Sequence, residues 1–339
     1  MSQNDLPAAS PDQDQGQSVV FIDDNTEQAS DSDPDRLQAK LQQRADNVTS
    51  WLSDNSMVIA PDKTKLVVSA TKELRSARLP TRLLAVKVGQ NVITATPSEK
   101  LLGVVLGSDL TWSAHLWGES WRTEKNNTGL IPQLIRRLGL LKHLARLSSK
   151  GKMRSFVPAM FTSKILYALP LIASIWGLTQ YAEREPHKFS FTKHDIGRLQ
   201  TLQRQAALLL CPAHHQDQPI PTTELLDEVR WLSVHQLAAH TTLALTVRIV
   251  QSGKPTYLAE KLVPATNSRT QQNSLVVPRC RLNVTFEGYV NQATRLYNLL
   301  PADIRCEPSK ATLKKKLKLW TRDNIITKVI TGPVVQTAT

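Results

Sequence analysis

The chain has 339 residues, 41% of them hydrophobic, so it is long enough for one large domain or two ordinary ones with buried cores. Its 42 Lys and Arg against 29 Asp and Glu give a net charge of +13, which favours polyanionic partners: most often nucleic acid, less often acidic membranes or proteins. The three cysteines are too widely spaced for a disulfide framework, and no apolar segment follows a basic start at the N-terminus. These features exclude a small disulfide-stapled domain and favour an intracellular protein, nuclear or cytoplasmic.

The charge is unevenly distributed along the chain. The first 35 residues hold nine acids and no Lys or Arg, so the remaining residues carry 42 − 20 = 22 excess positive charges. Residues 1–17 are polar and have almost nothing to bury, which predicts a disordered acidic tail.

Residues 18–116 are predicted to form a small unit of short antiparallel strands and a helix. The apolar run Val19–Ile22 reads as a strand that stops at a tight turn, Asp23-Asp24-Asn25. A helix over 34–54 follows, because Asp33 is a suitable N-cap and Pro34 suits the first helical position. Further strands are predicted at 57–59, 66–68 and 101–106, with a turn at 61–63 and Gly103 inside the last strand.

The rest of the chain is predicted to be mostly helical, which makes the fold class α+β. Leucine and isoleucine recur at helical spacing over 130–147, 156–176, 197–210, 222–232, 237–250 and 309–326. Pro170 is expected to kink the second of these helices, whose apolar part (165–178) is too short to span a bilayer. Prolines and a polar run after residue 252 separate a helical region, 117–252, from a C-terminal region, 253–339.

The pair Asp23-Asp24 carries the most specific chemistry. Nucleotidyl transfer uses two divalent metals about 4 Å apart. Magnesium prefers oxygen ligands, so carboxylates held at the end of a rigid strand are suitable. Taken alone, Asp-Asp-Asn is also an ordinary turn sequence.

Four segments in order resemble a known family. Phe21-Ile22-Asp23-Asp24 resembles the Y/F-x-D-D box of reverse transcriptases, and Trp51–Asn55 resembles the Trp-Leu-x-x-Asn end of the helix that follows it. Ala60–Thr64 is similar to an Asn-Pro-x-Lys-Thr turn, and Leu102–His115 to a Leu-Gly-x-x-Leu-Asp-x-x-Leu-x-Trp-x-x-His segment. Tyr297–Arg305 also resembles a closing Trp-Asn-x-Leu-Pro-x-x-Ile-Arg segment. The family is the reverse transcriptase of non-LTR (LINE-type) retrotransposons, in its part from the Asp-Asp box onward.

The resemblance implies specific roles. Asp23 and Asp24 would be catalytic ligands of Mg²⁺ or Mn²⁺, and Lys63 would lie near the incoming triphosphate. Leu102, Gly103 and Leu110 would belong to a hairpin that grips the primer end. Residues 18–116 would then be an incomplete palm and 117–252 a thumb. The expected partners are an RNA template and an RNA–DNA hybrid, with no membrane.

The family's other metal-binding Asp lies on a strand upstream of the Asp-Asp box, and no Asp before Ser18 ends an apolar strand. This chain alone is therefore not expected to polymerise. The alternatives are a nucleic-acid-binding protein that is not an enzyme, a helical interaction module, or a decayed reading frame without function.

Basic residues are concentrated where the family has its thumb. The residues expected to contact phosphates are Arg136, Arg137, Lys142, Arg146, Lys150 and Lys152. The ordinary alternative is a solvated helix face. A second basic cluster over 310–322 reads as solvated surface or a nuclear-import signal, and Cys211-Pro-Ala-His214-His215 as a weak zinc candidate without a second pair of ligands.

Overall fold

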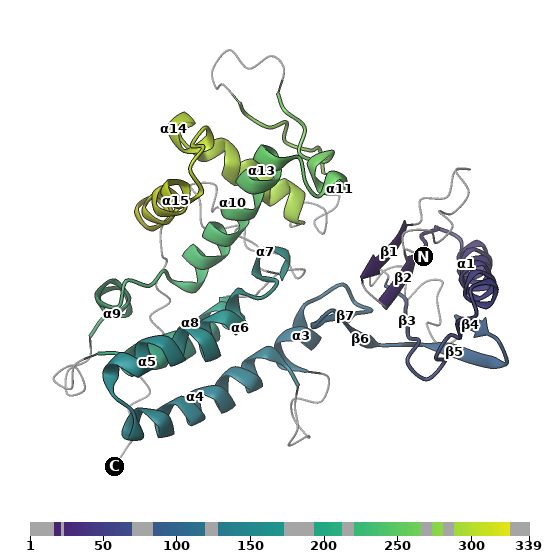
Figure 1. Cartoon of the computed structure of the whole chain (residues 1–339), viewed down its shortest axis with the longest axis horizontal. Coiled ribbons are helices and arrows are strands. Elements are labelled where there is room, and N and C mark those ends of the chain that lie inside the picture. Colours follow the sequence, from purple (N-terminus) through teal and green to yellow (C-terminus); the bar gives the residue numbers. More distant parts are fainter. Residues whose placement is uncertain are drawn as a thin grey trace. The chain divides into compact units, whose positions relative to one another are not determined.

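The structure, a computed structural model, describes residues 17–21, 24–69, 84–118, 128–172, 193–211, 220–265, 273–280 and 288–325 (Figure 1). The chain divides into two compact units, Met1–Ala114 and His115–Thr339. The first contains all seven strands of the described residues and one long helix, and the second is helical. The α+β class and the mostly helical character beyond residue 117 are confirmed.

The first unit begins with the hairpin β1 (Gln17–Phe21) and β2 (Asp24–Gln28), whose last pair is Phe21 with Asp24. The predicted strand therefore exists. Glu27 of β2 accepts a hydrogen bond from Arg44 at 2.9 Å, and Arg44 is only 5% exposed. This buried ion pair ties the hairpin to the helix that follows.

Helix α1 (Pro34–Asp54) has the bounds that its capping signals predict. The Asp33 carboxylate accepts from the backbone N–H groups of Asp35 and Arg36, and Pro34 occupies the first helical position. Two glutamines one turn apart, Gln38 and Gln42, attach the helix to strand β4 (Ala85–Val88).

Each of these glutamine amides bonds both backbone groups of one β4 residue. Gln42 donates to Lys87 O at 2.9 Å and accepts from Lys87 N at 2.8 Å, and Gln38 does the same with Ala85. Strand β4 lies at the edge of a three-stranded sheet of order β3–β5–β4. The side-chain amides thus take the place of a fourth strand and cover this edge.

The sheet departs from the prediction of antiparallel strands. Strand β5 (Asn91–Thr96) pairs antiparallel with β4 but parallel with β3 (Leu66–Val67), so it lies between the two strands that precede it in the chain. The strand predicted at 57–59 is wrong. There the Met57 N–H donates back to Leu52 O at 2.7 Å, which closes the helix end, and no described strand pairs with these residues.

The strand predicted at 101–106 is also wrong: two strands lie here, β6 (Ser98–Leu101) and β7 (Val104–Gly107). Leu102 and Gly103 form the turn between them, with φ of 46° and 87°. Positive φ at both central residues is the type I′ pattern, whose twist matches that of the strands. Glycine adopts it freely, whereas Leu102 is strained.

The second unit is built from helices of uneven length. Their bounds are α3 (Ser113–Trp117), α4 (Leu130–Leu147), α5 (Lys150–Val157), the π-helical turn η2 (Pro158–Thr162), α6 (Ser163–Leu166), α7 (Leu169–Ile172), α8 (Lys193–Leu208), α9 (Thr222–Glu228), α10 (Val234–Ser252), α11 (Thr256–Ala259), α13 (Tyr289–Leu299), α14 (Ala302–Arg305) and α15 (Lys310–Asn324). The prediction for α4 has the observed bounds. Helix α13 was not predicted, and α9 ends four residues before its predicted end.

Helix α10 is the centre of this unit and packs against α7, α8, α13 and α15 (Figure 1). Its apolar residues Ala239, Leu243 and Val247 are fully buried at spacings of four. A capping box starts the helix: Ser233 accepts from Gln236 N, and the Gln236 side chain accepts from Ser233 N. Gly253, in the left-handed conformation, ends it.

The run Lys150–Ile172 is the one described segment that is long and apolar enough, by length and composition, to cross a membrane. Its buried residues lie on one stripe, which packs inside the unit: Met153, Val157, Phe161, Ile165, Leu169 and Ile172, each at most 1% exposed, while 28% of the apolar window as a whole is buried. The kink predicted at Pro170 lies instead at Tyr167 and Ala168, where Ala168 has a φ of 56°. Pro170 falls in the first turn of the next helix, where proline is tolerated.

Candidate functional site

The structure describes the Asp-Asp pair only in part. Asp23 lies outside the described residues, and only the backbone of Asp24, the first residue of β2, is described. Among the described residues no group of three or more His, Cys, Asp or Glu side chains could hold a metal ion. These residues do not provide the ligand set for Mg²⁺ or Mn²⁺ that the family resemblance implies, and the metal-ligand roles of Asp23 and Asp24 stay predictions.

The other palm residues lie on turns. Lys63 is exposed in the predicted turn, where its N–H donates to Ala60 O at 3.1 Å. Leu102 and Gly103 form the tip of the β6–β7 hairpin, and Leu102 is 44% exposed. Leu110 follows β7 with a φ of 57°. A hairpin with an apolar side chain at its tip is thus present, but Leu110 lies outside it, and the primer-grip role of these residues stays a prediction.

The predicted phosphate-contacting residues lie on α4 and α5. Residues 128–172 contain eight Lys and Arg and no Asp or Glu. Most of these cations are exposed; we call the following set the basic surface: Arg136, Lys142, Arg146, Lys150, Lys152 and Arg154. The opposite face of α4, with Leu134, Leu138 and Leu141, is buried, so the cations are held on a rigid helix.

The position of two lysines is electrostatically unfavourable for folding. Lys150 is the first residue of α5 and Lys152 lies in its first turn, at the positive end of the helix dipole. Cations there cost about 0.3–1 kcal/mol each. The Ser149 side chain makes no capping hydrogen bond, so the first N–H groups of α5 are left for other acceptors. Exposed cations and uncapped N–H groups together favour an anion such as phosphate.

One predicted contact residue has a structural role. Arg137 is half-buried, and its Nη1 donates to Met160 O in η2 at 2.7 Å. A π-helical turn leaves backbone carbonyls without their α-helical partners, and Arg137 satisfies one of them. Arg137 thus joins α4 to η2.

The second basic cluster, on α15, is used within the fold. Lys316 contacts Glu307 at 2.8 Å, Lys318 donates to Arg230 O at 2.9 Å, and Arg322 contacts Asp323 at 2.9 Å. Lys314 and Lys315 are exposed on the same helix. This arrangement agrees with the solvated-surface interpretation.

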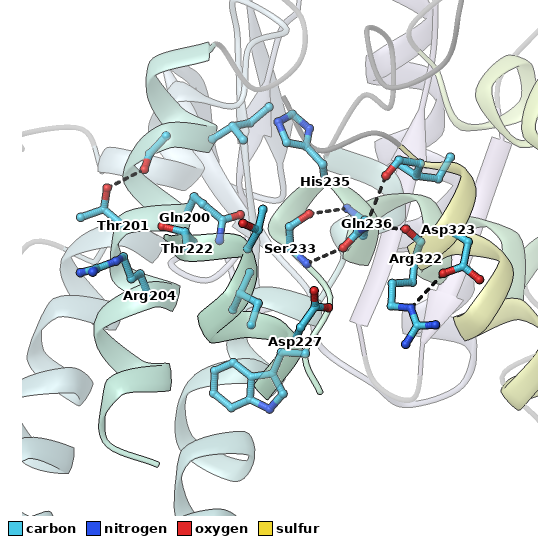
Figure 2. A pocket seen from close by; sticks show the side chains of 16 residues that line it. Gln200, Thr201, Arg204, Thr222, Asp227, Ser233, His235, Gln236, Arg322 and Asp323 are labelled. Carbon is cyan, nitrogen blue, oxygen red and sulfur yellow. Dashed lines mark hydrogen bonds and ion pairs between the residues drawn. The ribbon is translucent and has the colours of Figure 1, made fainter. Parts of the chain in front are cut away.

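A pocket of about 390 Å³ lies where α8, α9 and the ends of α10 and α15 meet (Figure 2). Its polar side chains mostly hold helices together. Gln236 donates to Arg322 O at 3.1 Å and Ile325 O at 3.3 Å, Gln200 accepts from Val234 N at 3.0 Å, and Arg204 donates to Ile220 O at 3.1 Å.

The chemistry of this pocket is that of a helix junction. Its charged residues are balanced, with Arg204 and Arg322 against Asp227 and Asp323. Burial lowers the pKa of His235 to about 4, so this histidine is neutral near pH 7. The Ser233 hydroxyl accepts from Gln236 N as a helix cap, which is a structural use of the group. The sequence signal that was missed here is the Ser-x-x-Gln of the capping box.

Cys211 of the predicted zinc candidate is a buried residue of the hydrophobic core. Cys211 is 5% exposed and packs with Ala207, Leu225 and Leu226. Burial raises the pKa of its thiol, which disfavours the thiolate that binds metals. His214 and His215 lie outside the described residues.

Comparisons of the chain with protein-family models, with curated proteins and with solved structures find no match.

Proposed function

We propose that this chain is part of a LINE-type reverse transcriptase and that its helical unit acts as the thumb. The basic surface of this unit binds an RNA–DNA hybrid or an RNA duplex. The observation that carries the proposal is the acid-free segment 128–172, which holds its exposed cations on α4 and around the uncapped start of α5. Solubility alone does not require lysines at the N-terminal end of a helix, where the helix dipole disfavours positive charge.

The dimensions of α4 suit a duplex. Arg136 and Arg146 are ten residues apart on one helix, about 15 Å along its axis. Since successive phosphates of one strand of B-form DNA advance about 3.4 Å along the duplex axis, this length spans about four base pairs of B-form DNA and somewhat more of the more compressed A-form that RNA duplexes adopt. Phosphate contacts of this kind position a duplex without reading its sequence.

The polymerase assignment rests on the family resemblance. In that assignment Asp23 and Asp24 are the metal ligands, Lys63 contacts the nucleotide, and the β6–β7 hairpin contacts the primer. Hybrid binding by the second unit needs none of these residues.

The test is a charge-neutralising pair with a matched control. Arg136→Gln with Arg146→Gln removes two charges from the basic surface, and Lys314→Gln with Lys315→Gln removes two exposed charges from α15. Binding of a fluorescent RNA–DNA hybrid is measured by anisotropy. At roughly 0.1 M salt the first pair should lose about tenfold in affinity per contact, and the control pair much less.

If the two pairs lose the same affinity, binding depends only on the net charge of the chain, and the proposal of a defined binding surface is contradicted. Because the exposed leucines Leu140 and Leu147 lie on the same helix, anionic lipid vesicles are the second ligand in the assay. Binding to vesicles but not to hybrid would overturn the proposal.

A further inference from the structure

A second hollow in the helical unit has a buried arginine in its wall. It measures about 480 Å³ and lies between the end of α10, the chain around Pro264 and Leu275, and α13 and α14. Arg305, the last residue of α14, is 5% exposed, whereas Gln251, Asn273 and Cys306 at the same hollow are exposed. The volume is in the range of sites for small molecules.

The guanidinium group of Arg305 is incompletely satisfied. Its Nε and Nη1 atoms are buried and have no hydrogen-bond partner within the described part of the chain. Tyr297 lies under the group, with the guanidinium carbon 5.9 Å from the ring centre. A cation–π contact compensates part of the lost hydration, but it leaves the N–H donors without acceptors. A buried charge without a partner is strongly disfavoured.

The nearest acids in the sequence do not neutralise Arg305. Glu307 contacts Lys316 at 2.8 Å, and Asp303 lies 3.7 Å from the same lysine. Among the described residues that line the hollow, Arg305 is the one with a charge, and none is Asp or Glu. The hollow therefore has an uncompensated positive charge in its wall.

The hollow is rigidly built around this charge. Asn298 of α13 bonds both backbone groups of Leu275, accepting from its N–H and donating to its carbonyl, each at 2.8 Å. Leu275 in turn forms an antiparallel bridge with Pro264. Gln251 of α10 donates at 3.0 Å to the backbone carbonyl of Glu307, which lies just beyond the end of α14. The walls are thus fixed by hydrogen bonds that leave Arg305 unused.

We propose that this hollow is a binding site for a small molecule with an oxyanion, a carboxylate or a phosphate, which pairs with Arg305. Guanidinium binds both groups through charge-assisted hydrogen bonds. Val250, Pro264 and Leu275 form an apolar wall for the body of the ligand. The site is independent of the basic surface and of hybrid binding.

The test uses inorganic phosphate and acetate as probes on the full chain, at constant ionic strength with chloride as reference. Phosphate at ten times its dissociation constant should raise the melting temperature of the wild type by about 3 °C. Arg305→Met keeps the length of the side chain without its charge. It should melt at or above the wild-type temperature in chloride, and its melting should not respond to either probe. Lys314→Gln with Lys315→Gln, which removes two exposed charges of α15 outside the hollow, should respond as the wild type does.

A measurement on the wild type alone covers the case in which Arg305→Met fails to fold. Cys306 is an exposed free thiol at the hollow, and Cys280 is a free thiol outside its lining. The probe that binds should slow alkylation of Cys306, read by peptide mass spectrometry, and leave Cys280 unchanged. A response to acetate as well as phosphate indicates a carboxylate-tolerant site, and a response to phosphate alone a phosphate site. If neither probe shifts melting or protects Cys306, the proposal is wrong.

Discussion

Replacing His235 with glutamine is expected to remove much of an acid-induced loss of stability. His235 lies at the pocket where α8, α9, α10 and α15 meet, and burial lowers its pKa from 6.5 to about 4. The unfolded chain therefore binds a proton between these two pH values while the folded chain does not. The unfolding free energy is therefore unaffected by this group above pH 6.5 and decreases as the pH falls toward 4.

The size of the effect follows from the two pKa values. Between about pH 7.5 and about pH 5 the linkage relation gives a loss of about 2 kcal/mol of unfolding free energy from this one group. His240, whose pKa is also lowered by burial and by Lys318 and Lys314, adds a loss in the same direction.

Urea unfolding followed by far-UV circular dichroism at the two pH values measures the difference. His235→Gln should lose about 2 kcal/mol less than the wild type on acidification, and His143→Gln, at an exposed position of α4, should behave as the wild type. An unchanged pH dependence in His235→Gln would refute the reasoning.

Of three further predictions, two rest on the described contacts and the third on the family resemblance. Leu102→Asn gives the hairpin an Asn-Gly turn, and asparagine tolerates the left-handed conformation better than leucine. The substitution should therefore raise the unfolding free energy of the first unit by about 1 kcal/mol, measured by urea unfolding. A lower unfolding free energy would contradict the backbone strain at Leu102. Arg137→Ala should lower the unfolding free energy by about 1–3 kcal/mol, since Met160 O loses its donor. The exposed Arg146→Ala on the same helix should leave the unfolding free energy within about 0.5 kcal/mol, and equal effects of the two substitutions would contradict the structural role of Arg137. The isolated chain should not extend a primer on an RNA template with Mg²⁺ or Mn²⁺, and extension that Asp23→Ala abolishes would overturn this expectation.

The sequence predicts those elements whose signals are local. Helix α1 has its observed bounds because Asp33 and Pro34 specify its start, and α4 because its buried leucines recur at helical spacing. Where tertiary contacts determine the structure, the prediction from sequence is wrong or absent. The parallel pairing joins β3 and β5, which are not consecutive strands, and the edge of β4 is covered by Gln38 and Gln42, residues that read as ordinary solvated positions of a helix.

The candidate sites show the same division. Composition identifies the cationic segment, but only the structure separates Arg137, which bonds η2, from its exposed neighbour Arg136. The Tyr297–Arg305 segment stands out in the sequence, yet burial of Arg305 could not be predicted, because arginine is usually exposed. Asn298 and Tyr297, which precede it, acquire a physical role as the groups that hold and cover the hollow.

The central claim is that α4 and the start of α5 bind a nucleic-acid duplex through phosphates, and a salt titration of hybrid binding tests it most directly. Each phosphate contact releases counterions, so the logarithm of the association constant should fall linearly with the logarithm of salt concentration, by about 0.7–0.9 per contact. Arg136→Gln with Arg146→Gln should flatten that slope by about two units, whatever the sequence of the hybrid. Affinity that is indifferent to salt, or a slope that the two substitutions leave unchanged, would contradict the account.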